Sequence, residues 1–441
     1  MAKMEELNDE IDRREYRRRR RVRNQIISYV VLGVFLVSLV FGGVLGVNKL
    51  IAGMKDRKQA EELQKQLEEL SQAEQEPQVV EAPEESTENY EEVDYLDEIV
   101  NASIAEMPLE DKVAGLFIIT PEALTDTDVV IKAGDTTKEK LGQHAVGGLV
   151  YFSQNIKSAE QLTEMLSNTR SWSKYPIFLA VDEEGGQVSR VAESGLAENV
   201  GSMSDIGAAG DTTKAQEAGT AIGSYLSGFG FNLNFAPVAD VAAEGNTIIG
   251  DRSFGSDTNL AATMATAMVQ GMQGAGVSAC LKHFPGIGDT TEDTHEGMAV
   301  TDKTLEDFAA VDFPVYQAGI AAGVDFVMVG HLSTPNVTGD NTPASLSGKM
   351  ITEILRGQLG YQGIVITDAM NMSAITEYYT ADQAAVMALQ AGADMILMPE
   401  DFETAYNGVL EAVQNGTLTE ERINESLKRI FRVKRRDRVE E

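Results

Sequence analysis

The chain has 441 residues, and its 69 acidic side chains against 36 basic ones give a formal net charge of −33 at pH 7. An acidic body of this kind argues against nucleic acid as a partner, because binding a phosphate backbone requires a basic patch and none appears outside the N-terminus. The single cysteine, Cys280, excludes an intramolecular disulfide, and the length fits either two or three average domains or one large α/β barrel with additional segments.

The N-terminal region is predicted to be a membrane anchor. Residues 13–23 contain eight arginines, and residues 26–47 carry no charge. At about 1.5 Å per residue this run is about 33 Å long, enough to cross a hydrocarbon core of roughly 30 Å. The positive-inside rule keeps residues 1–25 cytoplasmic and the rest outside, which predicts a single-pass membrane protein. A cleaved signal peptide is the alternative, and Gly42 and Gly46 have the spacing with which membrane helices form a weak homodimer.

Residues 48–95 connect this anchor to the rest of the chain. Leu63, Leu67 and Leu70 recur at helical spacing in a stretch rich in Glu, Gln and Lys, which predicts a short helical stalk. Residues 76–95 are acidic, contain prolines and have little to bury, so we expect a disordered spacer there. The folded domain is expected over residues 96–435.

Within this domain, short apolar runs alternate with helical patterns. The predicted strands are residues 116–120, 148–152, 177–181, 231–236, 277–281, 326–329, 364–367 and 395–398. Predicted helices between and after them include residues 159–172, 214–226, 259–273, 305–322, 349–359 and 420–435. Eight such units predict a TIM-type (β/α)8 barrel. A doubly wound open sheet is the alternative fold.

Polar residues cluster where the predicted strands end, which in a TIM-type barrel is the face that carries the active site. Asp182 follows the third strand, Lys282 and His283 follow the fifth, and His331 follows the sixth. Asp368 ends the seventh strand, and Arg190 and Arg252 lie in the segments after the third and fourth. We therefore expect these side chains to converge on one rim.

The best nucleophile candidate is Asp368, a carboxylate fixed at the mouth of a buried strand. Cleavage of a sugar acetal with retention needs a nucleophile and a proton donor that later activates water. His295 could be that donor, with Asp293 two residues earlier orienting its imidazole. The alternative for Asp293 is a turn-capping aspartate.

The stretch from Lys282 to His295 resembles the K-H-F-P-G-H-G and D-S/T-H motif of glycoside hydrolase family three, in its bacterial exo-β-N-acetylglucosaminidase branch. Further similarity lies, in the family's order, around Asp182, Arg252 and Asp368, and it covers roughly residues 96–435. The resemblance implies that Asp368 is the nucleophile, His295 the general acid/base and Asp293 its partner. It also implies that no metal or organic cofactor is needed. The residues expected to hydrogen-bond the terminal sugar's hydroxyls and acetamido group are Asp182, Arg190, Arg252, Lys282 and His283.

Two positions depart from the family's pattern. Ile287 stands where a histidine is usual, and Glu183 stands where a glutamine is frequent. We expect the pocket beside the acid–base loop to differ accordingly. The chain also has no room for the second α/β domain that many relatives carry, which disfavours the β-glucosidase branch.

The expected function is that of a membrane-anchored retaining β-N-acetylhexosaminidase that removes terminal N-acetylglucosamine from peptidoglycan-derived glycans outside the cytoplasm. Phosphorolysis beside hydrolysis is a minor hypothesis, because a neutral imidazole repels an anionic acceptor less than a carboxylate does. One alternative is a metal-dependent barrel hydrolase, whose candidate ligands are Asp289, Asp293, His295, His283 and His331. Another is a catalytically silent protein that binds wall glycan.

Overall fold

The computed structural model describes residues 95–243, 245–290 and 297–436. The predicted membrane helix, the stalk, and Gly42 and Gly46 lie outside the described residues, and so do Asp293 and His295. Over the residues that are described, no helix combines the length and the apolar character needed to cross a bilayer.

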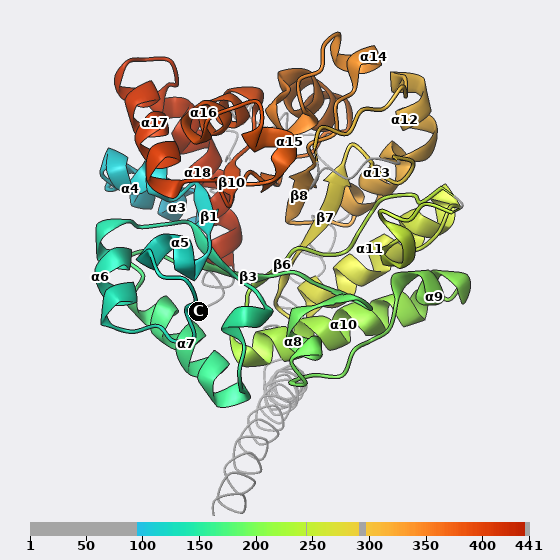
Figure 1. Cartoon of the computed structure of the whole chain (residues 1–441), viewed down its shortest axis with the longest axis horizontal. Helices are drawn as coiled ribbons and strands as arrows, with labels where there is room; N and C mark the ends of the chain where they lie inside the picture. The colour runs from blue at the N-terminus through green and yellow to red at the C-terminus, as the bar shows by residue number, and fades with distance from the viewer. Residues whose placement is uncertain (1–94, 244, 291–296, 437–441) are drawn as a thin grey trace, which may run out of the picture. The chain divides into compact units, whose positions relative to one another are not determined.

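Eight parallel strands close into a barrel in the order β1-β10-β9-β8-β7-β6-β3-β2, which confirms the TIM-type prediction (Figure 1). The barrel strands are β1 (Phe117–Ile119), β2 (Gly148–Tyr151), β3 (Phe178–Val181), β6 (Leu233–Asn234), β7 (Ser278–Phe284), β8 (Phe326–Val329), β9 (Ile364–Ala369) and β10 (Met395–Leu397). Closure occurs where Phe117 of β1 pairs with Ile396 of β10. Continuous apolar runs form these strands because helices cover the barrel from outside, so both faces of each strand are buried.

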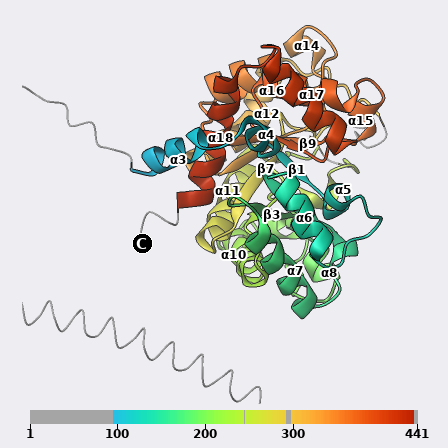
Figure 2. The same cartoon turned by 90° about the vertical axis from the view of Figure 1, so that its left-hand side faces the viewer.

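Helices surround the barrel, and two views at right angles show them on its outside (Figures 1 and 2). The longer ones are α3 (Tyr95–Ala105), α6 (Asp135–Gln143), α7 (Ala159–Trp172), α10 (Thr212–Phe229), α11 (Thr258–Gly274), α13 (Phe313–Ala321), α16 (Ala381–Ala391), α17 (Phe402–Gln414) and α18 (Glu420–Arg435). The shorter ones are α4 (Leu109–Ala114), α5 (Pro121–Thr125), α8 (Arg190–Glu193), α9 (Met203–Ala208), α12 (Leu305–Val311), α14 (Pro335–Thr338) and α15 (Ser373–Thr376). Tighter turns lie at Ser153–Asn155, Gly250–Arg252 and Ala344–Leu346, and Lys349–Gln358 is wound as a π-helix.

Helix ends follow local chemistry. The side chain of Ser158 accepts a hydrogen bond from the backbone N–H of Gln161, which starts α7 at the predicted residue. The single helix predicted over residues 305–322 is wrong in one respect, because α12 and α13 are separate helices that meet at Asp312. The reason is Pro314, which lacks a backbone N–H and is tolerated only in the first turn of a new helix.

The fifth barrel strand is longer than its predicted range of 277–281. It extends to Phe284 because the segment after β6 continues to pair with it: the N–H of Ala239 donates to the Lys282 carbonyl at 2.6 Å. Lys282 and His283 therefore lie within β7, and the loop starts only at Pro285. A short antiparallel hairpin after β3, formed by β4 (Glu183–Gly185) and β5 (Val188–Ser189), is a second feature that the apolar pattern did not indicate.

Candidate active site

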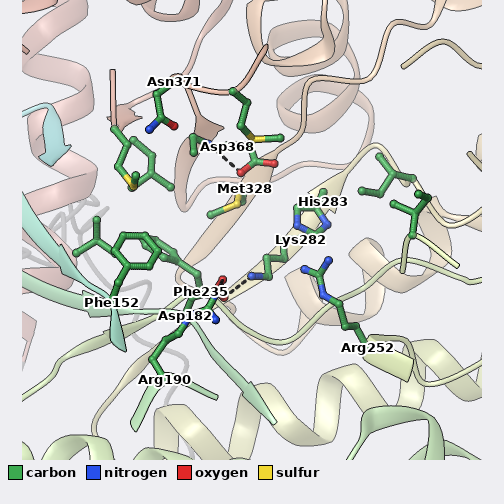
Figure 3. A pocket seen from close by; sticks show the side chains of 17 residues that line it. Phe152, Asp182, Arg190, Phe235, Arg252, Lys282, His283, Met328, Asp368 and Asn371 are labelled. Atoms are coloured by element: carbon green, nitrogen blue, oxygen red, sulfur yellow. Dashed lines mark hydrogen bonds and ion pairs between the residues drawn. The ribbon is translucent and has the colours of Figure 1, made fainter. Parts of the chain in front are cut away.

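A pocket of about 310 Å³ opens at the carboxyl ends of the barrel strands. Six of the seven described residues expected at this rim line it, and His331 does not; the six are Asp182, Arg190, Arg252, Lys282, His283 and Asp368. In Figure 3, Asp368 lies across the pocket from Asp182 and Arg190, with Lys282 and His283 between them. The rest of the lining is largely apolar, with Phe152, Phe235, Ile248, Ile287, Met328 and Met398 among its members.

Lys282 joins two acidic side chains that come from the end of β3 and from β4. Its Nζ lies 2.5 Å from Asp182 Oδ1 and 2.6 Å from Glu184 Oε1, and the Lys282 side chain is only 3 % exposed. Burial alone lowers the pKa of a lysine, but the charges of Asp182 and Glu184 outweigh it and raise the pKa of Lys282 above its ordinary value. Lys282 therefore stays an ammonium and keeps a fixed direction in the pocket.

Arg252 is held by the same Glu184. Its Nε and one terminal nitrogen reach the two Glu184 oxygens at 2.7 and 2.8 Å, a bidentate pair. Burial raises the pKa of Glu184, but the Lys282 and Arg252 charges outweigh it, so the pKa lies far below the ordinary value. The sequence reasoning gave Glu184 no role, although it stands in the acidic run after β3.

Arg190 begins α8 and reaches the pocket next to Asp182, with Nη2 at 3.9 Å from Asp182 Oδ2. Its Nε is buried and has no hydrogen-bond acceptor among the described residues. Glu183 fixes the start of α8, since its carboxylate accepts from the backbone N–H groups of Val191 at 2.7 Å and Ala192 at 3.0 Å. Tyr225 donates its hydroxyl to the same carboxylate at 2.8 Å.

His283 is oriented by Asp240, a residue that sequence reasoning missed. Asp240 Oδ2 lies 2.8 Å from His283 Nδ1, and Asp240 also accepts from the backbone N–H groups of His283 and Ile287. Because a carboxylate accepts, Nδ1 of His283 carries the hydrogen, which leaves Nε2 for a ligand. No local signal marks Asp240, because its partners lie more than forty residues further along the chain.

Asp368 projects from the end of β9 into the pocket. The backbone N–H of Ala369 donates to Asp368 Oδ1 at 2.8 Å. Burial by itself raises the pKa of Asp368, but nearby His283 and His331, the Ala369 N–H and Lys282 together lower the pKa below its ordinary value. The side chain is therefore an ionised carboxylate at neutral pH, the form that can attack an electrophilic carbon.

Comparison with known proteins identifies the family of the chain. The model of the glycosyl hydrolase family 3 N-terminal domain matches residues 108–433. The chain belongs to glycosyl hydrolase family 3. It is accordingly a glycosidase, as the sequence motif predicted.

Family 3 members with similar sequences and structures include β-hexosaminidases. That of Stenotrophomonas maltophilia (strain R551-3) is 37 % identical over 289 residues, which cover 64 % of this chain and 84 % of the relative. That of Xylella fastidiosa (strain M23) is 38 % identical over 275 residues, 61 % and 81 % of the two chains. The family 3 β-N-acetylglucosaminidase of Paenibacillus sp. str. FPU-7 superposes with a TM-score of 0.69 at 36 % identity. This match covers 76 % of the present chain, which spans 64 % of that structure's length.

The two residues that depart from the family 3 pattern have different positions. Glu183 does not line the pocket; its carboxylate accepts from the start of α8 and from Tyr225, so its influence on the pocket is indirect, through α8 and Arg190. Ile287 does line the pocket, and its buried side chain adds to the apolar wall beside Ile248.

The acid–base candidates of the family 3 motif, Asp293 and His295, lie outside the described residues. The chain on either side of them is tied together: Lys303 Nζ lies 3.2 Å from Asp289 Oδ1 and 2.8 Å from Asp312 Oδ2. Of the metal ligands considered for the alternative function, His283 and His331 point ring nitrogens at Asp240 and Ser345. Across the described part of the chain, no three side chains of His, Cys, Asp or Glu are grouped so as to hold a metal ion.

Proposed function

We propose that this family 3 glycosidase is a retaining β-N-acetylhexosaminidase that releases terminal N-acetylglucosamine from peptidoglycan-derived glycans. The observation that carries the proposal is the placement of an ionised Asp368 across one pocket from Asp182, Arg190, Lys282 and His283. The relatives named β-hexosaminidase and β-N-acetylglucosaminidase support the substrate class.

In the first half of the proposed reaction, Asp368 attacks the anomeric carbon. The bond between this carbon and the leaving oxygen breaks while a bond to the carboxylate oxygen forms. By the family resemblance, His295 donates its proton to the leaving oxygen, and Asp293 stabilises the charged imidazole before that transfer.

In the second half, a water molecule replaces the leaving group. The neutral His295 takes a proton from the water, whose oxygen bonds to the anomeric carbon as the bond to Asp368 breaks. Two inversions at one carbon return the original configuration, so the product is the β-anomer of N-acetylglucosamine.

The remaining pocket residues hold the sugar. Lys282 and Arg190 are donors beside the Asp182 acceptor, a combination suited to hydroxyl groups, each of which donates once and accepts twice. Nε2 of His283 and the guanidinium of Arg252 are placed for a further hydroxyl and the acetamido oxygen. A pocket of about 310 Å³ suits a single terminal sugar, which supports exo-action.

The N-terminal sequence supports a proposal for where the substrate lies. We propose that residues 26–47 anchor the protein, that residues 1–25 stay in the cytoplasm, and that the barrel acts on wall glycan outside. Pairing through Gly42 and Gly46 is part of the same proposal. Membrane fractionation and protease treatment of intact cells test this proposal. Detergent should be needed to release the protein from membranes, and the protease should reach the barrel only from the outer side.

The function is tested with the full-length protein in detergent and 4-nitrophenyl N-acetyl-β-D-glucosaminide. Asp368→Asn removes the attacking charge, so we expect turnover to fall by at least roughly 1,000-fold while the unfolding midpoint stays within the normal range for a point mutant. Glu403→Gln makes the same charge change at an exposed residue paired with His144 and is the matched control. Near-normal turnover by Asp368→Asn would sink the mechanism.

Product analysis tests the finer claims. Wall glycan and soluble muropeptides should release N-acetylglucosamine as monosaccharide and leave chain interiors intact. With phosphate present, absence of N-acetylglucosamine 1-phosphate removes the phosphorolysis hypothesis. Full turnover after chelation removes the metal-dependent alternative, and glycan binding without release of any product would favour the silent binding protein.

A further inference from the structure

His331 is a fully buried histidine that the proposed reaction does not use. It follows β8 and belongs to the described residues with no exposed surface, as does Ser345. Its Nδ1 lies 2.8 Å from the Ser345 hydroxyl, and its Nε2 lies 3.0 Å from the backbone carbonyl of Ala369. Ala369 is the residue directly after the nucleophile candidate Asp368.

The two contacts fix where the hydrogens of His331 lie. A carbonyl oxygen only accepts, so Nε2 carries a hydrogen and donates it to Ala369. In the neutral ring Nδ1 then accepts from the Ser345 hydroxyl, which can also accept when the ring is charged. Ser345 is itself held in place, because its backbone N–H donates to the Gly330 carbonyl at 3.1 Å.

The Ala369 carbonyl belongs to a peptide unit that is held at both ends. His331 donates to its oxygen, and its N–H, which belongs to Met370, donates to the Leu397 carbonyl at 2.9 Å. The preceding peptide unit presents the Ala369 N–H to Asp368 Oδ1 at 2.8 Å. This leaves Oδ2 as the Asp368 oxygen that no donor among the described residues engages, on a side chain that lines the pocket.

We propose that His331, oriented by Ser345, is a positioning residue that fixes the Asp368–Ala369 corner so that Oδ2 faces the anomeric carbon. The inference rests on the proposed function, because it assigns Asp368 the role of nucleophile. Its physical basis is that attack requires the carboxylate within a few tenths of an ångström of its productive position, and the peptide after Asp368 sets the direction of its side chain.

A role in core packing alone makes a different prediction. An apolar side chain of similar volume would fill the same space and would remove the cost of burying two ring nitrogens. If packing were the whole role, His331→Leu would therefore keep its activity. If positioning is the role, activity should follow the hydrogen bond to Ala369 and not the filled volume.

The experiment compares His331→Leu, His331→Gln and Ser345→Ala in the full-length protein. The amide nitrogen of glutamine can reach the place of Nε2 and donate to Ala369, whereas leucine cannot. With the aryl glucosaminide we expect kcat to fall about 100-fold in His331→Leu and about tenfold or less in His331→Gln. Ser345→Ala should lie between them. KM and calorimetric binding of N-acetylglucosamine should change less than about threefold in all three.

His144→Leu is the matched control, since His144 is also largely buried but precedes β2 at the opposite end of the barrel. The proposal is overturned if His331→Leu keeps kcat within threefold of the wild type, if His331→Gln is no better than His331→Leu, or if binding and kcat fall together. Ser345→Ala, a small change, keeps the test open should His331→Leu fail to fold.

A readout without turnover separates this inference from the proposed function. The chain has four histidines, and ¹⁵N-histidine NMR distinguishes the two neutral tautomers. The wild type should show one ring with a persistent Nε2–H that is absent from His331→Gln and altered in Ser345→Ala. If the wild type lacks this Nε2–H signal, the inference is contradicted even when the enzyme is active. An inactive wild type that shows the pattern instead contradicts the proposed function alone.

Discussion

Asp312 provides a pH-dependent test of how the loop after β7 is held. Its side chain is buried between α12 and α13, and Oδ2 pairs with Lys303 at 2.8 Å. Burial raises the pKa of Asp312 from 3.8 to about 7, because the attraction of Lys303 does not offset the loss of water and the charges of Asp240 and Asp289 add to it. Oδ1 has no hydrogen-bond donor among the described residues.

The sign and size of the effect follow from linkage. Between pH 3.8 and about 7, the Asp312 carboxyl is mostly protonated in the folded state and mostly ionised in the unfolded state. The contribution of Asp312 is therefore fully present below the unfolded pKa and is lost as pH rises toward about 7. Each tenfold change in proton affinity is 1.36 kcal/mol, so the loss amounts to roughly 4 kcal/mol as an upper bound.

Asp312→Asn removes the titration. We expect its stability relative to the wild type to increase steadily from pH 4 to pH 7 and then to level off. Urea unfolding followed through the single tryptophan, Trp172, at each pH measures the difference. Asp307→Asn is the control, because this carboxylate is exposed and its pKa is lowered, chiefly by the backbone N–H of Thr304. Parallel stability curves for wild type and Asp312→Asn would refute the reasoning.

Two further variants test a charged side chain of the pocket and one that lies behind it. Lys282→Met removes the ammonium shared by the buried Glu184 and the partly exposed Asp182, while Arg252 still pairs with Glu184. The free energy of unfolding, measured with urea, should therefore fall by about 2–4 kcal/mol, and kcat/KM by about 10- to 100-fold. No change in either quantity would contradict the ion pairs. Glu183→Gln keeps one acceptor oxygen but turns its amide NH2 toward a donor of α8 or Tyr225, so the free energy of unfolding should fall by about 1–3 kcal/mol while activity stays within about threefold. A large loss of activity there would place Glu183 in the chemistry after all.

The sequence predicted the barrel well because its strands are the simplest kind of signal. Each is a short run that is apolar on both faces, and such runs arise where a parallel strand is covered by helices. The prediction failed where polarity was taken as the end of a strand. Lys282 and His283 are charged or polar, yet they continue β7, because Asp182, Glu184 and Asp240 compensate them inside the protein.

The polar pocket residues were found from their place at strand ends, but the residues that orient them were not. Lys282 and Asp182 are 100 positions apart, and His283 and Asp240 are 43 apart. A local sequence pattern does not indicate which carboxylate will pair with which cation, since the pairing depends on the register of the strands in the closed barrel. Glu184, Asp240 and Ser345 therefore became visible only in three dimensions.

The ion pairs of the pocket form an alternating row: Arg252, Glu184, Lys282, Asp182 and Arg190. Its three positive and two negative side chains leave one positive charge, which the Asp368 carboxylate of the same pocket balances, so a ligand meets little net charge there. An uncharged sugar suits such a surface, since it has no charge to be steered and only hydroxyls to be matched. The strongly acidic protein can thus offer a site with little net charge. Its selectivity comes from the directions of hydrogen-bond donors and acceptors, which are fixed before the sugar binds.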